Sequence, residues 1–294
     1  MRLETETNKE TNLSKKTIYE KSMSVVGKGI IYILVTLGAL ATLFPFFYML
    51  VLATKSTAEI FSFPPPLWFG DSFMDNLNTL LDAMPFFKNI MNSIFVATVR
   101  TILTLFFCSL GGYAFAKYDF KGKEILFFLM LATMMIPGLL AIIPWFILMS
   151  KLNWLNTFYP LIIPGVANAF GIFLMRQFME GIPDDVIDSA RIDGCGEFQI
   201  FYRIILPMSL PGLGTLGILT FLGSWNMYLQ PLLVLGDKAL YTIPVALSKL
   251  GGKIDQNWGA QMVGTTLAIA PIVIAFVLAS KQFISGLTEG AIKG

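Results

Sequence analysis

Residues 176–207 read RQFMEGIPDDVIDSARIDGCGEFQIFYRIILP, a polar stretch inside a chain that is otherwise strongly apolar. Pro183 suits the first turn of a helix, and Gly194 supplies the positive φ with which helices commonly end. A second amphipathic segment follows and ends at Pro207. The stretch is therefore predicted to be a helix–turn–helix, either a solvated connector or a projection that docks into a groove on a partner.

Both segments have an apolar side. In the first, Asp188 and Arg191 stand close enough on a helix to form an ion pair. The residues that share its apolar face are Val186, Ile187 and Ala190, opposite Asp184, Asp188 and Arg191; in the second segment Phe198, Phe201, Tyr202 and Ile205 are apolar.

The composition around this stretch is that of a membrane protein. The chain has 294 residues, of which 55% are hydrophobic and 14% charged, with a net charge of +2, whereas soluble domains carry about 25% charged residues. It contains no histidine, which removes the commonest general base and metal ligand and disfavours an intramembrane enzyme. No basic cluster is interleaved with aromatic residues, so nucleic acid is not an expected partner. Cys108 and Cys195 stand in dissimilar contexts and indicate no disulfide framework.

Apolar runs predict an all-α integral membrane protein, since about 20 apolar residues cross a bilayer as a helix. The third run is interrupted by Pro137, Gly138 and Pro144. We predict six spans: Gly29–Thr54, Asn89–Ala116, Ile125–Met149, Phe158–Met175, Met208–Leu235 and Ala260–Ser280. The remaining parts are a polar N-terminus (1–28), an extracytoplasmic loop (55–88), a five-helix core (89–280) and a C-terminal tail (281–294).

Lysine and arginine in the loops predict the orientation. Of the 21 basic residues, fourteen fall on one side and six on the other if the N-terminus is cytoplasmic. Both termini are therefore expected in the cytoplasm, together with residues 176–207. The remaining one, Arg100, lies inside the second span, where it either snorkels to the outer interface or faces the bundle near the transport path.

The polar stretch resembles the EAA signature of binding-protein-dependent ABC importer permeases. That signature is Glu-Ala-Ala, three residues, Gly, nine residues and Ile-x-Leu-Pro. The corresponding residues here are Asp188, Ser189 and Ala190, then Gly194, then Ile204, Ile205, Leu206 and Pro207. Two positions depart from it, because Asp188 replaces Glu and Ser189 replaces Ala.

Other segments resemble the sugar-permease branch of the same family. They are NSIFVATVRTILTLFFCSLGGYAFAKYDFKGKEILF (92–127), MMIPGLLAIIPWFILM (134–149), LNWLNTFYPLIIP (152–164), SWNMYLQPLLVL (224–235) and FISGLTEGAIKG (283–294). The resemblance is to the smaller membrane subunits of maltose-type and other oligosaccharide importers, and it implies the type I importer permease fold in a bacterial cell membrane.

The resemblance also implies partners: a second similar permease, two cytoplasmic ATPase subunits and an extracytoplasmic sugar-binding protein. The stretch 176–207 would form a coupling helix seated in the ATPase, and the C-terminal tail would either be disordered or touch the ATPase dimer. The residues implied to meet the ATPase are Asp188, Ser189, Ala190 and Gly194, with Ile204, Leu206 and Pro207 anchoring the loop to the fifth span.

ATP hydrolysis is expected in the partner subunits, which would hold Mg-ATP, and no cofactor is expected here. The chain has no G-x-x-x-x-G-K-[ST]. Residues 212–217 fit G-x-G-x-x-G, but they open a membrane span rather than follow a strand, so these glycines are interpreted as helix-packing positions.

Sugar hydroxyls need hydrogen bonds, and sugar faces stack on aromatic rings. The candidate substrate contacts are Asn168, Trp225, Asn226, Tyr228 and Gln230. The alternative for each is an interhelical hydrogen bond or an interface anchor. Two other functions stay open: a permease for a non-sugar solute such as glycerol phosphate or a polyol, and an ion-coupled secondary transporter, although the spans offer no ionisable residue beyond Arg100.

Overall fold

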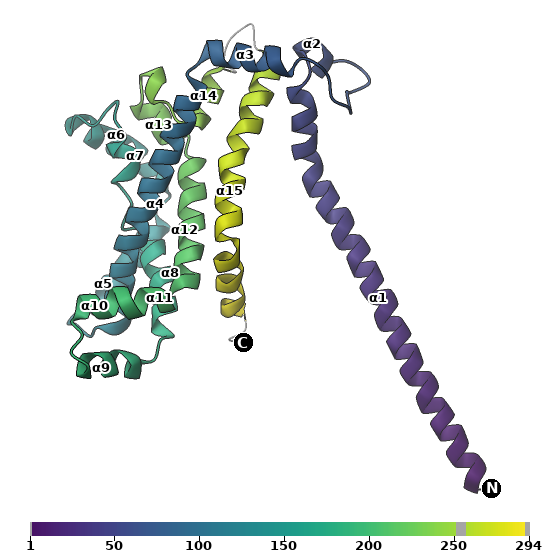
Figure 1. The fold of residues 1–294 in the computed structure, drawn as a ribbon. Coiled ribbons are helices and arrows are strands. Elements are labelled where there is room, and N and C mark those ends of the chain that lie inside the picture. The colour runs from purple at the N-terminus through teal and green to yellow at the C-terminus, as the bar shows by residue number, and fades with distance from the viewer. Residues whose placement is uncertain (1, 251–256, 292–294) are drawn as a thin grey trace.

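The computed structural model describes the backbone of residues 2–250 and 257–291 and the side chains of residues 27–250 and 257–277. Within these ranges every regular element is helical (Figure 1). The α-helices are α1 (Arg2–Ala53), α2 (Thr57–Ile60), α3 (Phe73–Ala83), α4 (Phe86–Lys117), α5 (Lys123–Ala132), α6 (Ile142–Lys151), α7 (Tyr159–Ile162), α8 (Ala169–Glu180), α9 (Asp184–Ile192), α10 (Glu197–Ile200), α11 (Leu206–Met208), α12 (Leu210–Trp225), α13 (Leu229–Val234), α14 (Ile243–Leu250) and α15 (Trp258–Ala291). Shorter turns are η1 (Thr133–Met135), η2 (Gly138–Ala141), the π-helical η3 (Phe201–Ile205) and η4 (Lys238–Leu240).

Four long helices form the bundle. The helix α4 packs against α8 and α12, and α12 packs against α15 (Figure 1). At one end lie α2, α3 and α14, and at the other lie α9 and α10. The helices α1 and α15 begin and end, respectively, toward the same side as α9 (Figure 1), which agrees with the predicted placement of both termini with the polar stretch.

All six predicted spans fall on helical regions, but the third, fourth and fifth are not single helices, and among the described residues the fourth contains no helix long enough to cross a membrane. In the described residues three helical segments are long and apolar enough to cross a membrane, Gly27–Ala53, Phe86–Lys117 and Trp258–Val277. Two further candidates are pairs of helices bent at a break, by 89° within 123–151 and by 79° within 197–225. Counting each pair as one gives up to five spans.

The breaks have local causes. The predicted third span divides at Pro137 and Gly138 into α5 and α6, because proline removes a backbone donor and clashes with the preceding turn. The predicted fourth span divides into α7 and α8, and Asn168 caps α8 by accepting a hydrogen bond from the amide of Gly171 at 2.8 Å. The predicted fifth span ends at Trp225, and residues 229–234 form the separate helix α13.

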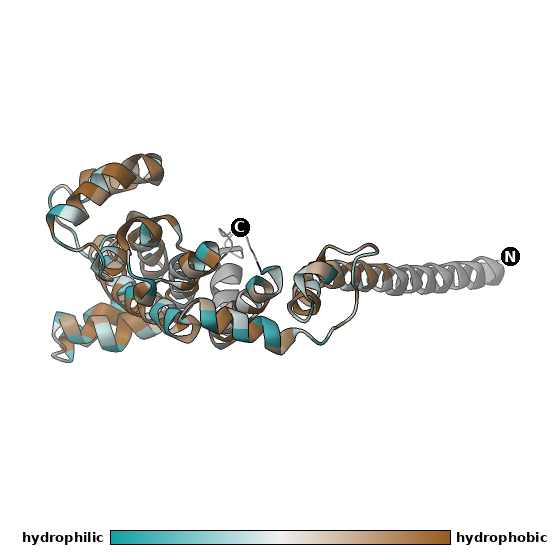
Figure 2. Ribbon diagram, turned by 90° about the horizontal axis from the view of Figure 1, so that it is seen from above, coloured by the Kyte–Doolittle hydropathy of each residue, from teal (hydrophilic) through white to brown (hydrophobic). Residues whose placement is uncertain are grey.

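The first helix differs from the prediction at its start. Instead of a separate polar segment, residues 2–28 continue the same helix into the apolar run. That run diverges from the bundle (Figures 1 and 2), and its apolar side chains between Ile30 and Phe47 stay exposed. Only at its end, at Val51 and Ala53, does α1 become buried. Hydrophobic residues make up much of the bundle's ribbon in Figure 2, and many large hydrophobic side chains outside α1 are exposed, among them Ile125, Phe128 and Ile143, as expected of a surface that faces lipid or another subunit.

Glycines let α4 and α8 approach closely. A Cβ on Gly112 of α4 would lie 2.6 Å from the Cβ of Met175 of α8, and a Cβ on Gly171 of α8 would lie 2.6 Å from the Sγ of Cys108. Both contacts are far inside van der Waals distance, so only glycine fits at either position. A Cβ on Gly212 would likewise lie 2.6 Å from Cδ2 of the Phe178 ring, which confirms the interpretation of Gly212 as a packing position.

We predict that Gly112→Leu lowers the melting temperature of the purified protein by several degrees, because the added side chain forces α4 away from α8. Overpacking of this kind typically costs about 1–3 kcal/mol. Gly38→Leu is the matched control, since a Cβ on Gly38 of α1 meets no atom within 4 Å. Equal melting temperatures for the two variants would show that the α4–α8 contact is not close-packed.

Candidate functional site

The helix α9 lies at one end of the bundle and is attached by its apolar side. Ile187 and Ala190 are buried, whereas Asp185, Asp188 and Ser189 on the other side are exposed. The apolar core that receives α9 consists of Met175, Met179, Ile182, Ile200, Phe201 and Ile205, among others. This core joins α8, α9, α10 and η3, so α9 is fixed to the bundle rather than suspended on a free loop.

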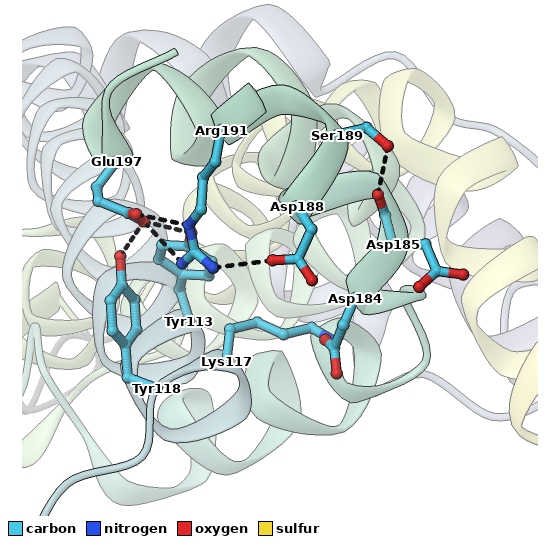
Figure 3. A network of polar contacts seen from close by, with 9 residues as sticks. All are labelled: Tyr113, Lys117, Tyr118, Asp184, Asp185, Asp188, Ser189, Arg191 and Glu197. Carbon is cyan, nitrogen blue, oxygen red and sulfur yellow. Dashed lines mark hydrogen bonds and ion pairs between the residues drawn. The ribbon is translucent and has the colours of Figure 1, made fainter. Parts of the chain in front are cut away.

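A polar network fixes the other side of α9. Arg191 Nε donates to Glu197 Oε1 at 2.8 Å, and Arg191 Nη1 donates to Asp188 Oδ1 at 3.1 Å (Figure 3). The second oxygen of Glu197 accepts a hydrogen bond from the hydroxyl of Tyr118 and one from that of Tyr113 at 3.5 Å. Glu197 therefore connects α9 and α10 to the end of α4. The predicted pair of Asp188 and Arg191 is confirmed.

Charge and burial in this network shift the pKa values in consistent directions. The Arg191 guanidinium, followed by the Tyr118 hydroxyl, lowers the pKa of Glu197 by hydrogen bonding to its carboxylate. The same carboxylate raises the pKa of Arg191. Burial, and then the hydrogen bond to Glu197, raises the pKa of Tyr118. At neutral pH the network therefore consists of an ionised carboxylate, a guanidinium and neutral phenols.

Lys117, the last residue of α4, binds the start of α9. Its Nζ donates to the carbonyl of Ile182 at 2.5 Å and to Asp184 Oδ1 at 2.7 Å (Figure 3). The Lys117 side chain is only 5% exposed, so its charge depends on these two acceptors. The hydrogen bond and charge of Lys117 lower the pKa of Asp184. Sequence reasoning used Lys117 only for orientation, although its position after Tyr-Ala-Phe-Ala was the available signal.

The exposed tip of the stretch follows α9. Gly194 adopts φ +82°, and a Cβ there would meet no atom within 4 Å. The side chain of Ile192, just before it, is 86% exposed. Ile192 was missed by the sequence reasoning, which grouped apolar residues only on the inner face. Ser189 uses its hydroxyl within the helix, donating to the carbonyl of Asp185 at 2.7 Å.

Two residues, Ala190 and Pro207, have an environment that differs from the predicted one. Ala190 was expected to offer a small surface to a partner, but it is 6% exposed and packs inside this chain's own core. It positions α9 and is not a free contact surface. Ile204 and Leu206 pack partly against the same core, as their anchoring role predicts, while Pro207 is exposed.

A second candidate site is a recess of about 500 Å³ between α4, α8, α12 and α13. It brings together three of the five predicted substrate contacts, Asn168, Tyr228 and Gln230. The other two do not line it: Trp225 is buried and stacks on Phe221 with ring centroids 6.0 Å apart, and Asn226 is exposed elsewhere. Arg100 also lines the recess, so it faces the bundle rather than snorkelling outward.

Comparison with known proteins agrees with this architecture. Residues 108–287, more than half of the chain, match the family described as binding-protein-dependent transport system inner membrane component. The chain belongs to this family. The structure of this permease also resembles that of a bacterial ABC transporter involved in the import of the acidic polysaccharide alginate, with a TM-score of 0.76 and 25% sequence identity over 86% of this chain and 95% of the other. Its fold is therefore that of the type I importer permeases.

Curated relatives cover nearly the whole permease. It is 39% identical to the arabinooligosaccharides transport system permease protein AraQ of Bacillus subtilis, over 87% of this chain and 92% of that protein. It is 33% identical to the lactose transport system permease protein LacG of Rhizobium radiobacter, over 89% and 95%. It is 30% identical to the sn-glycerol-3-phosphate transport system permease protein UgpE of Yersinia pestis, over 88% and 95%. These relatives are transport permease subunits, not enzymes.

We predict that Glu197→Gln lowers the melting temperature of the solubilised permease at neutral pH, because the amide loses the charge that holds Arg191. Since the pKa of Glu197 is lowered in the folded state, this stabilisation is fully present above the ordinary pKa of glutamate, roughly 4.3. It is lost as the pH falls through the lower folded-state value. The difference in melting temperature between wild type and variant should stay constant from about pH 7 to about pH 5 and shrink below about pH 4.

Asp185→Asn is the control for this measurement, because it removes one negative charge from the same loop at a side chain with no ion pair among the described residues. A pH-independent effect of Glu197→Gln, or an equal effect of Asp185→Asn, would contradict the role assigned to Glu197.

Proposed function

We propose that this permease is one of two membrane subunits of an ATP-driven importer for a sugar or oligosaccharide. The observation that carries the proposal is the pairing of an EAA-like helix, fixed at one end of the bundle, with a polar recess between its long helices. The relatives that transport arabinooligosaccharides and lactose support a saccharide. The UgpE relative supports the alternative of a phosphorylated polyol.

The proposed arrangement has six membrane crossings, with the bent pairs and the α7–α8 segment supplying the crossings that are not single straight helices. The excess of basic residues on the side of α9 supports a cytoplasmic location for both termini and for residues 176–207. The recess would then open toward the path between the two permease subunits. The extracytoplasmic sugar-binding protein would deliver substrate from the side of α2 and α3.

In this proposal the exposed tip of α9 docks into a cytoplasmic ATPase subunit, one of two that hold Mg-ATP. Asp188 and Ser189 face outward, and Gly194 and Ile192 form the tip. Moving an alternating-access equilibrium from 1:99 to 99:1 takes about 5.5 kcal/mol, whereas one exposed ion pair contributes at most about 1 kcal/mol. Apolar contact by Ile192 and the rigid attachment of α9 are therefore proposed to supply most of the free energy of coupling.

The role proposed for the C-terminal tail, contact with the ATPase dimer, concerns side chains outside the described residues. The backbone of α15 continues to Ala291 on the side of α9.

We predict that the complex reconstituted with its partner subunits and binding protein hydrolyses ATP faster when the transported saccharide is present. The measurement is ATPase activity across a panel of arabinose oligosaccharides, lactose and glycerol 3-phosphate. If glycerol 3-phosphate alone stimulated the ATPase activity, the phosphorylated polyol would replace the saccharide as the proposed substrate. If the purified permease carried no ATPase subunit with it, the importer function would be contradicted.

We predict that Gly194→Trp leaves the permease inserted in the membrane but reduces sugar uptake by at least tenfold, equivalent to about 1.4 kcal/mol of lost coupling. Tryptophan is strained at positive φ and adds bulk at the docking tip. Gly122→Trp is a close control, since Gly122 also has a positive φ (+86°) and open space around a Cβ, but it lies between α4 and α5. Normal uptake by Gly194→Trp, or equal losses in both variants, would count against docking through this tip.

A further inference from the structure

Arg100 is a cation placed within α4, at the edge of the recess described above. Its Nη1 donates to the carbonyl of Leu161 at 2.9 Å and lies 3.8 Å from the sulfur of Met227. The Nε and Nη2 groups have no protein acceptor within the described part of the chain. Nη2 lies beside Gly165, where a Cβ would approach it to 3.4 Å. One edge of the guanidinium is thus held by the backbone while its remaining donors are available.

No acidic side chain in the described part of the chain neutralises that charge. The six predicted spans contain no aspartate or glutamate, and among the described residues Arg100 forms no ion pair. Charged side chains at membrane depth are costly, so they generally face a cavity or a partner group. The other basic residues that the structure pairs, such as Lys117 and Arg176, meet carboxylates.

The recess around Arg100 contains further unused polar groups. The hydroxyls of Thr104 and Ser224 are buried and have no hydrogen-bond partner. Tyr228 and Gln230 line the same recess. Buried polar groups are ordinarily hydrogen-bonded, and unsatisfied ones call for an absent ligand or water. A guanidinium, a phenol and an amide at one recess distinguish it from the neighbouring one of about 450 Å³ between α4, α12 and α15, whose lining is apolar apart from Thr101.

Size and chemistry point to the same kind of ligand. A volume of about 500 Å³ suits an organic ligand such as a short saccharide rather than a single ion. A guanidinium is a planar fork that binds two adjacent oxygen atoms at once, which a lysine ammonium cannot do. In a saccharide, two adjacent oxygens occur as vicinal hydroxyls or as the carboxylate of a uronic acid.

We propose that Arg100 is a substrate-binding residue that grips a pair of adjacent oxygens on the translocated saccharide, with Tyr228 and Gln230 completing the contact. This inference rests on the proposed saccharide function and adds that this subunit itself holds the substrate. The hydrogen bond to the carbonyl of Leu161 presets the plane of the fork.

The test compares uptake of two trisaccharides into proteoliposomes that contain the complete complex and its binding protein. One is a neutral arabinose trisaccharide and the other an alginate trisaccharide, which carries carboxylates. We expect Arg100→Gln to reduce uptake of the transported trisaccharide by at least tenfold without lowering the melting temperature or the recovery of the complex. Lys151→Gln is the control, because it removes an exposed positive charge outside the recess and is expected to leave uptake unchanged.

Arg100→Lys distinguishes a substrate that presents vicinal hydroxyls from one that presents a carboxylate, and it also tests for a merely structural role of Arg100. Lysine retains a charge and a donor for Leu161 but loses the fork. If the substrate presents vicinal hydroxyls, Arg100→Lys should fail almost as completely as Arg100→Gln; if it presents a carboxylate, Arg100→Lys should retain much of the uptake.

Two results would overturn the role of Arg100. One is uptake by Arg100→Gln within twofold of wild type. The other is a loss of uptake in Arg100→Gln that comes with a lower melting temperature or failed assembly, while Arg100→Lys fully restores uptake of the neutral trisaccharide. That pattern would show that Arg100 acts as a helix contact and not as a substrate-binding residue. A wild-type complex that transports glycerol 3-phosphate but neither trisaccharide nor lactose would contradict the saccharide function instead.

Discussion

The burial of Ile187 and Ala190 beneath α9 is the contact on which the arrangement of this end of the bundle depends. Without it, residues 176–207 would be a polar loop joined to the bundle only at its two ends. With it, α9 shares one core with α8, α10 and η3, and the ionic network of Arg191 and Glu197 has a fixed geometry. The Lys117 side chain, nearly buried, then holds the first turn of α9 against the end of α4.

The long helix α4 joins the two candidate sites. Near its C-terminal end, Tyr113 and Lys117 hold the stretch that contains α9, and farther along the same helix Arg100 and Thr104 line the recess. Its contact with α8 is close because Gly112 and Gly171 carry no side chain. In the proposed coupling, a displacement of α9 would reach the recess through α4, whose close packing against α8 limits local bending.

Much of this was predictable from the sequence, because the relevant signals are local. Apolar runs located the three long straight candidate spans, helical spacing placed Ile187 and Ala190 on one face, and Asp188 paired with Arg191 as their spacing predicts. The positive φ of Gly194 followed from its position after a helix. The helix breaks were less predictable: prolines marked the one at Pro137, but hydropathy alone does not distinguish a straight span from the α7–α8 pair.

What could not be predicted depends on contacts distant in sequence. Glu197 binds Tyr118, which is 79 residues away, and Lys117 binds Asp184 across 67 residues; no periodicity encodes such a pairing. Trp225 and Asn168 looked alike as polar or aromatic residues in apolar runs, yet the first is a core residue and the second caps a helix beside the recess. Ala190 was assigned to the outer surface by analogy, and its burial follows only from the three-dimensional core.

The separation of α1 from the bundle has a consequence for how this protein is made. Between Ile30 and Phe46 the apolar side chains of the helix are exposed, and its backbone hydrogen bonds are internal, so the helix can enter the lipid as soon as it leaves the ribosome. The broken segments that follow have no such independence, since each short helix needs its neighbours to cover it. Biogenesis therefore divides into an early, autonomous anchoring step and a later cooperative one.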